Sequence, residues 1–319
     1  MDRQAQVFGQ SGHFLEALER ASAVASTDRP VIVVGERGTG KAVVAERLHR
    51  LSDRWNGPII TANGAALAQA ELFGEDGRSG RARTGLIQLA AGGTLVLEDV
   101  GALSPVSQLR LLRALERGEV GERHPRALDV RMVATTDAHL PALVAAGAFR
   151  ADLLDRLAFA VITLPPLRER GGDALLLAHH HGRRMAAELG RDGWHGFGEE
   201  AVAQLTAHRW PGNVRELQVT VERSVAAWTR PDEPVDALVL DAFASPWRPL
   251  TETAASLLDV VASETLEPVT DLRAATDAYE ERVVAEALER CRFNQRAAAK
   301  ALGLTYDQFR HTARKHELI

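Results

Sequence analysis

Short apolar runs rich in β-branched residues recur through the first 165 residues of the chain. They lie at residues 31–34, 58–61, 94–97, 130–134 and 159–164. Amphipathic stretches with helical periodicity separate them, as at Lys41 to Leu51 and Ser104 to Arg117. Continuous apolar strands that alternate with helices predict an α/β fold, with a mostly parallel sheet covered on both faces.

The pattern changes beyond this region. From Gly172 to about Arg230 the periodicity is helical throughout, which indicates a helical subdomain. Residues 231–270 are richer in Pro, Glu and Thr and only weakly periodic, so they predict a linker with at most one short helix. The last 50 residues are helical again.

The loop after the first apolar run has the composition of a phosphate-binding loop. It reads Gly35-Glu36-Arg37-Gly38-Thr39-Gly40-Lys41-Ala42 and leads into a helical stretch. Glycines at this spacing let backbone N–H groups face a phosphate, and Lys41 reaches the β and γ phosphates. These eight residues therefore predict nucleotide binding, since a glycine-rich turn that only starts a helix leaves Lys41 unexplained. Ala42, however, lacks the hydroxyl that Mg²⁺ is offered at this position.

Two carboxylates follow the third apolar run, in Thr94-Leu95-Val96-Leu97-Glu98-Asp99. In nucleotide hydrolases of this type one carboxylate holds Mg²⁺ through water and the next orients the attacking water. The usual order is Asp-Glu, whereas here Glu98 precedes Asp99, so each carboxylate is displaced by one methylene. A misplacement of roughly 1 Å can cost about 10²-fold in rate. We expect binding to survive and hydrolysis to be weakened; two solvated acids at a strand end are the alternative.

Composition adds one asymmetry to this picture. The 319 residues are 45% hydrophobic and carry a net charge of −5, and the single cysteine, Cys291, is compatible with a reducing cytosol. No apolar run reaches the roughly 18 residues of a membrane span, and the N-terminus lacks a signal peptide, so we expect a cytoplasmic protein without membrane insertion. From Arg290 onward the chain carries a net +5, and the residues before it carry −10. A basic tail on an acidic body favours a DNA-binding module at the C-terminus.

The tail itself has the pattern of a helix-turn-helix. A helix from Tyr279 to Arg290 precedes Asn294, the N-cap of a second helix, and Thr305 caps the last helix with Gln308 in a capping box. Phe309, Ala313 and Leu304 are expected inward. The second helix of such a motif meets base edges and its flanks meet phosphates, although a generic basic amphipathic helix is the alternative. The candidate DNA-binding residues are Arg296, Thr305, Tyr306, Gln308, Arg310, His311, Arg314 and Lys315.

Several motifs in fixed order resemble the AAA+ activators of sigma-54 RNA polymerase. They are GERGTGK, ELFG, GGTLVLED, FRADLLDRL, LPPLRER and WPGNVREL, and the tail NQRAAAKALGLTYDQFR resembles a Fis-type helix-turn-helix. The resemblance implies an AAA+ P-loop domain with a parallel sheet and a helical lid, followed by an all-α Fis-type domain. The expected parts are an α/β nucleotide-binding subdomain (1–171), a lid (172–235), a linker (236–270) and the helix-turn-helix domain (271–319).

The resemblance also implies roles for individual residues. Asn63 resembles the asparagine that relays the nucleotide state to the second carboxylate, and Arg215 the arginine that senses nucleotide from the lid. Arg150 and Arg156 match arginines that reach a neighbouring subunit's γ-phosphate, which implies a ring, expected to be a hexamer. ATP and Mg²⁺, held through water by Glu98, are the implied cofactors. The implied partners are double-stranded DNA upstream of promoters, the sigma-54 holoenzyme and, because no sensor domain precedes the ATPase, a separate regulatory protein.

Departures from the family pattern bear on function. Where the family carries a GAFTGA loop that touches sigma-54, residues 75–84 are shorter, hold no aromatic residue and contain Arg78, Arg81 and Arg83. A second loop near 122–129 is also short, and the sensor strand ends in Ala134-Thr135-Thr136 rather than asparagine. The three arginines face nucleic acid or an acidic partner, or belong to a solvated loop. Two alternatives to an activator follow: a DNA-binding repressor or antagonist that uses ATP only for assembly, and an AAA+ protein-remodelling chaperone.

Two smaller signals remain open. Adjacent helical residues fan out by about 100° each, so His179, His180 and His181 predict a solvated helix end rather than a metal site. Trp55, in a polar loop, either binds a partner or packs against the domain edge.

Overall fold

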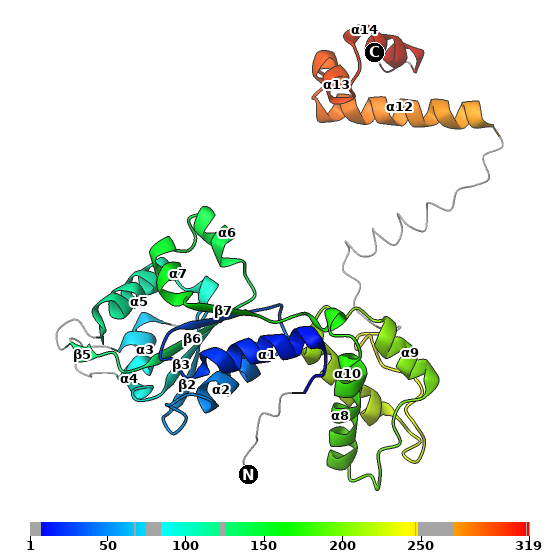
Figure 1. The fold of residues 1–319 in the computed structure, drawn as a ribbon. Helices are drawn as coiled ribbons and strands as arrows, with labels where there is room; N and C mark the ends of the chain where they lie inside the picture. The colour runs from blue at the N-terminus through cyan, green and yellow to red at the C-terminus, as the bar shows by residue number, and fades with distance from the viewer. Residues whose placement is uncertain are drawn as a thin grey trace. The chain divides into compact units, whose positions relative to one another are not determined.

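The computed structural model describes residues 8–66, 68–74, 84–120, 125–245, 247, 271–316 and 318. The chain divides into two compact units, residues 1–242 and 243–319 (Figure 1). The first unit holds a sheet and a helical lid, and the second holds three helices. None of the helices in the described ranges has the length and apolarity needed to cross a membrane.

A parallel five-stranded sheet forms the centre of the first unit, in the order β2-β3-β6-β1-β7. All five apolar runs form its strands, and their ends differ from the predicted ones by at most two residues. The predicted parallel sheet is therefore confirmed. The strands are β1 (Val31–Val34), β2 (Ile59–Asn63), β3 (Thr94–Glu98), β6 (Arg131–Thr136) and β7 (Ala160–Thr163).

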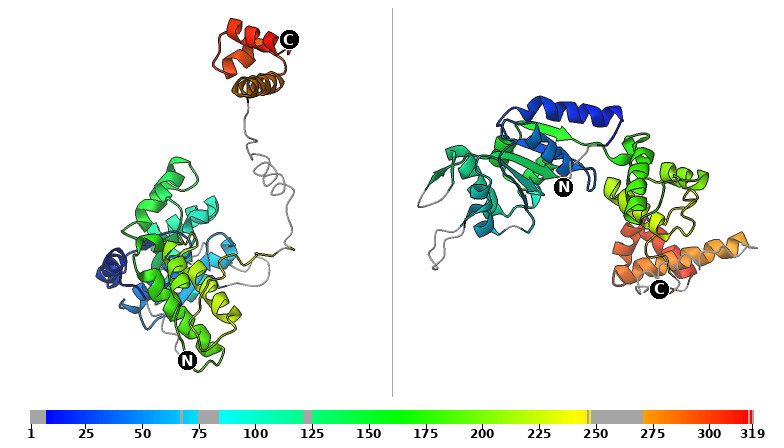
Figure 2. Two further views of the ribbon diagram at one scale, coloured as in Figure 1. Left: turned by 90° about the vertical axis from the view of Figure 1, so that its right-hand side faces the viewer. Right: turned by 90° about the horizontal axis from the view of Figure 1, so that it is seen from below.

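Successive side chains of the strands enter two separate cores, because strand residues alternate between the faces of a sheet. On one face, Val31 and Val33 pack with α1 (Gly12–Ala25) and α2 (Lys41–Arg50), and α1 lies alongside β7 (Figures 1 and 2). On the other face, Ile32 packs with a second layer of helices. That layer is α3 (Gln69–Phe73), α4 (Leu86–Leu89), η1 (Val100–Ala102), α5 (Pro105–Arg117), α6 (Leu140–Ala145) and α7 (Ala151–Leu157).

Two of the loops singled out in the sequence lie wholly or partly outside the described residues. Residues 75–83, which include Arg78, Arg81 and Arg83, lie outside them, as do residues 121–124 of the second loop. A short antiparallel pair, β4 (Glu119–Val120) and β5 (Arg126–Ala127), lies on either side of residues 121–124, so β5 falls within the second loop.

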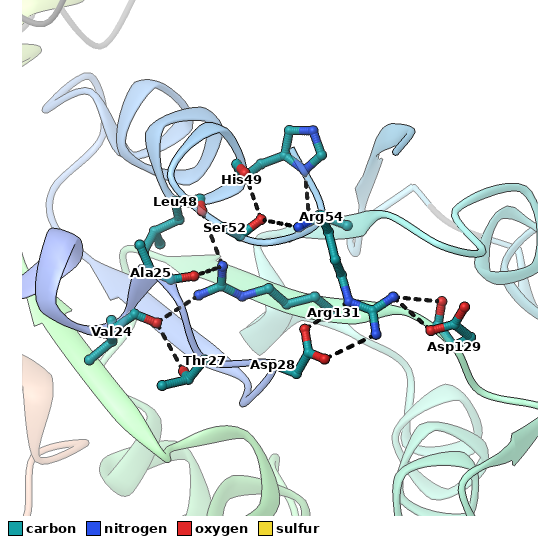
Figure 3. Close-up of polar contacts among 11 residues, drawn as sticks. Val24, Ala25, Thr27, Asp28, Leu48, His49, Ser52, Arg54, Asp129 and Arg131 are labelled. Carbon is teal, nitrogen blue, oxygen red and sulfur yellow. Dashed lines mark hydrogen bonds and ion pairs between the residues drawn. The ribbon is translucent and has the colours of Figure 1, made fainter. Parts of the chain in front are cut away.

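A buried arginine joins the helices at the amino end of the sheet (Figure 3). Arg131, at the start of β6, is 0% exposed, and its guanidinium donates to Ala25 O (2.6 Å), Val24 O (3.0 Å) and Leu48 O (3.1 Å). These carbonyls belong to the last turns of α1 and α2, which lack partners within their own helices. Burial lowers the pKa of Arg131, and the carbonyls and the negative ends of both helix dipoles oppose that effect by stabilising its charge.

A more exposed pair of interactions lies beside Arg131. Arg54 donates to the carboxylates of Asp28 and Asp129, each at 2.7 Å. The hydrogen bond from Arg54 lowers the pKa of Asp28. His49 Nδ1 lies 2.9 Å from Thr94 Oγ1, which joins the end of α2 to the start of β3.

The lid begins at η2 (Leu167–Glu169) and contains α8 (Asp173–Glu188), α9 (Glu199–Ala207) and α10 (Asn213–Ala227). Its core includes Trp210, which is 1% exposed. Leu238, three residues into the predicted linker, also packs in this core, and its N–H donates to Gln204 Oε1 at 2.8 Å. The weak periodicity at this point reflects an extended segment that packs on helices.

The prediction of a solvated helix end at the three histidines is wrong. They lie inside α8, and His181 is 7% exposed, with no hydrogen-bond partner for either ring nitrogen among the described residues. His180 stacks on Phe8, with ring centroids 3.9 Å apart. Burial lowers the pKa of His181 to about 4, so this histidine is neutral at pH 7.

The second unit packs α12 (Leu272–Arg290), α13 (Gln295–Ala301) and α14 (Tyr306–Lys315) around Phe309 and Ala313. Both predicted caps are present: Asn294 Oδ1 accepts from Ala297 N, and Thr305 and Gln308 form the capping box. Leu304 was expected inward but is 36% exposed. The N–H of Leu304 donates to Ala299 O in the turn after α13, which leaves its side chain at the surface.

Candidate nucleotide site

A pocket of about 560 Å³ opens at the carboxyl end of the sheet. It is lined by the loop after β1, the ends of β2, β3 and β6, and the first turns of α10 in the lid. Ligands of open α/β sheets bind outside the carboxyl ends of the strands. The pocket is therefore where a nucleotide is expected.

The loop after β1 has the backbone of a phosphate cradle. Gly38 and Gly40 adopt left-handed φ angles of 81° and 102°, and Gly40 precedes α2, whose first-turn amides have no partners within the helix. Lys41 Nζ lies along the loop and donates to Gly35 O (2.7 Å) and Glu36 O (3.1 Å). Burial lowers the pKa of Lys41, and the carboxylates of Asp137, Asp99 and Glu98 oppose that shift.

Gly38 also meets the lid. A Cβ on Gly38 would lie 2.1 Å from Gly212 O, and the N–H of Val214 donates to Gly38 O at 3.0 Å. Gly38 is thus required for two reasons: its φ angle favours glycine, and a side chain at this position would clash with the lid.

Not every residue of the predicted loop lines the pocket. Arg37, Gly38, Gly40, Lys41 and Ala42 do. Three other loop residues make hydrogen bonds with the sheet, within the loop or with the lid. Gly35 N donates to Thr136 O, Thr39 Oγ1 donates to Glu36 O at 2.8 Å, and the Glu36 carboxylate faces the lid.

The predicted carboxylates lie together at the end of β3. Glu98 pairs in register with Asn63 of β2, and the N–H of Gly64 donates to Glu98 O at 2.7 Å. Asp99 has a left-handed φ of 51°. Asn63, Glu98 and Asp99 all line the pocket, so the structure brings together the asparagine predicted to act as a relay and both candidate carboxylates.

Thr135 and Asp137 line the pocket as well, and neither was among the predicted site residues. Asp137 is the first residue after β6, which lies between β3 and β1, and no short stretch of the sequence encodes that strand order. The predicted sensor strand ended at Thr136, which is buried and whose carbonyl accepts from Gly35 N. Asp137, the next residue along the chain, lines the pocket.

The three arginines implied by the resemblance divide into two groups. Arg215, on α10, lines the pocket. Arg150 and Arg156, at the two ends of α7, do not. Arg150 pairs with Asp152 at 2.6 Å, and Arg156 is exposed, with no hydrogen bond or ion pair to a described residue. Both thus lie outside the nucleotide pocket of their own chain.

The eight candidate DNA-binding residues are all exposed. Tyr306 Oη donates to Gln295 Oε1 at 3.2 Å, and the Arg296 guanidinium lies 5.7 Å from the centre of the Tyr306 ring. Lys315 differs from the rest, because its Nζ bonds Asp277 (2.6 Å) and Glu280 (2.8 Å) of α12. Intramolecular carboxylates therefore compete with DNA phosphates for Lys315.

Comparison with known proteins covers nearly the whole chain. The Sigma-54 interaction domain profile matches residues 7–163, the AAA+ ATPase lid domain residues 168–244, and the bacterial regulatory protein, Fis family, residues 277–311. The Psp operon transcriptional activator of Escherichia coli is 42% identical over 98% of both chains. The nitric oxide reductase transcription regulator NorR1 of Cupriavidus necator is 43% identical over 69% of this chain and 45% of its own.

Solved structures agree with this assignment. NtrX from Brucella abortus in complex with ATP is similar with a TM-score of 0.69 and 27% identity, over 98% of this chain and 70% of that one. The predicted AAA+ domain with its lid and the Fis-type helix-turn-helix are thus confirmed. From the matched domains, and from its identity to the Psp operon activator over nearly its full length, the chain belongs to the family of sigma-54-dependent AAA+ transcriptional activators.

Proposed function

We propose that this chain is a cytoplasmic transcription regulator that binds ATP in the pocket and DNA through α14. The observation that carries the proposal is the meeting of Lys41, Glu98 and Arg215 in one pocket, on a chain that also carries a helix-turn-helix. Titration of the purified chain with a fluorescent ATP analogue tests the first part. Binding in the micromolar range that Lys41→Ala abolishes supports it, and equal binding by both proteins contradicts it.

The pocket suits a magnesium nucleotide in charge but departs from the usual set of donors. Lys41 and the free amides of α2 offer donors to phosphate oxygens, and Mg²⁺ bound with the nucleotide supplies electrophilic stabilisation of the phosphates. Glu98 would hold the ion through water. Ala42 adds no hydroxyl, and Asp99 is one methylene shorter than the glutamate expected to orient water. We propose that the chain binds ATP and hydrolyses it slowly.

The order of the carboxylates provides the test of slow hydrolysis. In the double variant Glu98→Asp/Asp99→Glu each carboxyl group regains its expected reach, and we expect ATP turnover to rise by up to about 10²-fold. Ala42→Ser is the matched test of the hydroxyl. If the unaltered protein turns over ATP as fast as the double variant, hydrolysis is not impaired by the order of these residues.

We further propose that the chain assembles as a ring, a hexamer, in which Arg150 and Arg156 reach the nucleotide of the next subunit. Their position outside their own pocket supports this, since a guanidinium supplied across an interface couples hydrolysis to assembly. Analytical ultracentrifugation with and without ATP tests it. We expect ATP to increase the sedimentation coefficient of both the unaltered chain and Arg156→Ala. ATP turnover should be lost in Arg156→Ala.

The helix-turn-helix is proposed to bind double-stranded DNA upstream of promoters. Arg310, His311 and Arg314 are exposed on α14, while Phe309 holds that helix on its core. Because one unit of this size offers few phosphate contacts, tight binding requires several units gathered by the ring. Trp55 is 62% exposed, which supports a separate regulatory protein bound to the ATPase body.

A second candidate function is that of a repressor or antagonist which uses ATP only for assembly. The Glu98-Asp99 order and the absence of an aromatic residue from 75–84 favour it. Transcription in vitro from a sigma-54 promoter separates the two functions. Open complexes formed with hydrolysable ATP support an activator that engages the sigma-54 holoenzyme, and DNA occupancy without open complexes supports the antagonist. The match to a Fis family domain argues against a chaperone.

A further inference from the structure

The carboxylate of Glu36 lies in the phosphate-binding loop but does not line the nucleotide pocket. It accepts two hydrogen bonds from Arg168, at 2.9 and 2.5 Å, and one from Asn213 Nδ2 at 3.1 Å. These bonds, that of Arg168 first, lower the pKa of Glu36 to about 2. The side chain of Glu36 is therefore an ionised acceptor that faces the lid at neutral pH.

Asn213 is the buried partner in this contact. It is 0% exposed, and its φ of 54° lies in the left-handed region, which asparagine tolerates better than most residues. Its Oδ1 accepts from Leu167 N at 2.7 Å, and its Nδ2 also donates to Arg37 O at 3.0 Å. One amide thus joins the connector that leads into the lid, the phosphate-binding loop and the start of α10.

Arg215 follows Asn213 by two residues on the first turn of the same helix. Val214, Arg215 and Gln218 are the pocket-lining residues that the lid contributes. A fixed amino end of α10 therefore fixes where the Arg215 guanidinium can reach. A misplacement of roughly 1 Å in such a group can cost about 10²-fold in rate.

We propose that Glu36, Arg168 and Asn213 form a latch that positions Arg215 against the bound nucleotide without touching the nucleotide. The inference deepens the proposed binding of ATP at this pocket and rests on it. The ion pair between Glu36 and Arg168 is partly exposed, with side-chain exposures of 42% and 34%. Such pairs add little to stability, so the latch can be opened without unfolding the chain.

A double-mutant cycle on the full-length chain tests the latch. We measure the Kd for Mg·ATP in the unaltered chain, Glu36→Ala, Arg215→Ala and the double variant. Each single change is expected to weaken binding roughly tenfold, as loss of a charge-assisted hydrogen bond does, and the double variant no more than about twofold further. Full multiplication of the two effects, or an effect of Glu36→Ala below twofold, overturns the proposal.

Matched controls keep the result specific. Arg184→Ala removes an ion pair with Glu222 elsewhere in the lid and is expected to leave the Kd unchanged. Arg168→Gln opens the same latch from its other side, so it replaces Glu36→Ala if that variant does not fold. A Kd equally weakened by Arg184→Ala contradicts positioning by the latch.

A second readout does not need nucleotide. Amide hydrogen exchange in the free chain is expected to increase at residues 214–218 in Glu36→Ala and not in Arg184→Ala. If the unaltered chain fails to bind ATP, the proposed function fails. The hydrogen-exchange pattern then tests the latch by itself, and unchanged exchange at residues 214–218 in Glu36→Ala overturns it.

Discussion

The two ends of one sheet differ in whether their charged side chains have hydrogen-bond partners within the protein. At the amino end, Arg131 is fully buried and bonded to the carbonyls that end α1 and α2 (Figure 3). At the carboxyl end, the side chains of Glu98, Asp99 and Asp137 line an open pocket and make no hydrogen bond to any residue that the structure describes. Satisfied polar groups hold a fold together, whereas charged groups left without protein partners in a pocket are available to a ligand.

Among the variants that distinguish the two ends of the sheet, Arg131→Met is expected to have the largest effect, on the free energy of unfolding. The change keeps an apolar stem but leaves the carbonyls of Ala25 and Leu48 without their side-chain donor. The free energy of unfolding should fall by about 3 kcal/mol, the cost of burying unsatisfied acceptors. Urea denaturation followed by circular dichroism measures it.

The control for this variant is Arg54→Gln, which removes two more exposed ion pairs at the same end and should cost about 1 kcal/mol. The Kd for ATP of folded Arg131→Met should stay within about twofold of the original. A stability unchanged by Arg131→Met, or a selective loss of ATP binding, breaks the contrast between the ends.

Acidification should weaken the fold before it weakens the contacts beside the nucleotide pocket. Burial lowers the pKa of His181 to about 4, below its ordinary value near 6.5. Between these values His181 is protonated in the unfolded chain but not in the folded chain, so the free energy of unfolding falls as pH drops from about 6.5 to 4. His181 accounts for at most about 3 kcal/mol of this loss. Burial also lowers the pKa of His49, which acts in the same direction.

Glu36 also loses its contribution on acidification but over a lower pH range, because its depressed pKa means that the contribution is present above about 4.5 and is lost only as pH falls toward 2. Denaturation at pH 7 and pH 5 should show a smaller pH dependence in His181→Gln, while His13→Gln, at an exposed position of α1, changes nothing. An unaltered slope in His181→Gln rules out this histidine as the source.

The smallest effect is expected from Asp137→Asn. Stability should change by less than about 0.5 kcal/mol, as for exposed positions. Affinity for ATP without Mg²⁺ should rise roughly threefold, because one negative charge near the phosphates is removed. The same titration with Mg²⁺ present should show a smaller rise. A large loss of stability in this variant shows that the carboxyl end also holds the fold.

Much of the fold could be predicted because hydrophobic period and helix-cap residues are local signals. The strands, α2, α5 and the caps at Asn294 and Thr305 follow from residues within one turn of each other. The extended segment at Leu238 has no such period, since its partners are Gln204 and the lid core. His181 was misjudged for a related reason: its burial comes from helices distant in sequence.

The candidate site was predictable where a short motif supplies the group, as for Lys41, Glu98 and Arg215. Asp137 was missed because its role depends on β6 lying between β3 and β1, an order that no short stretch encodes. Glu36 was read as a nucleotide ligand from its place in the loop. Its side chain instead meets Arg168 and Asn213, residues more than 130 positions away along the chain.

The contact between Gly38 and Gly212 has a mechanical consequence. Two bare backbones already touch there, so no side chain remains to be compressed and the lid cannot approach the loop more closely at this point. A lid movement that keeps this contact is therefore a rotation about it, beside the phosphate-binding loop. Arg215 lies close to this point, so a rotation that moves Arg215 slightly moves the far end of the lid further.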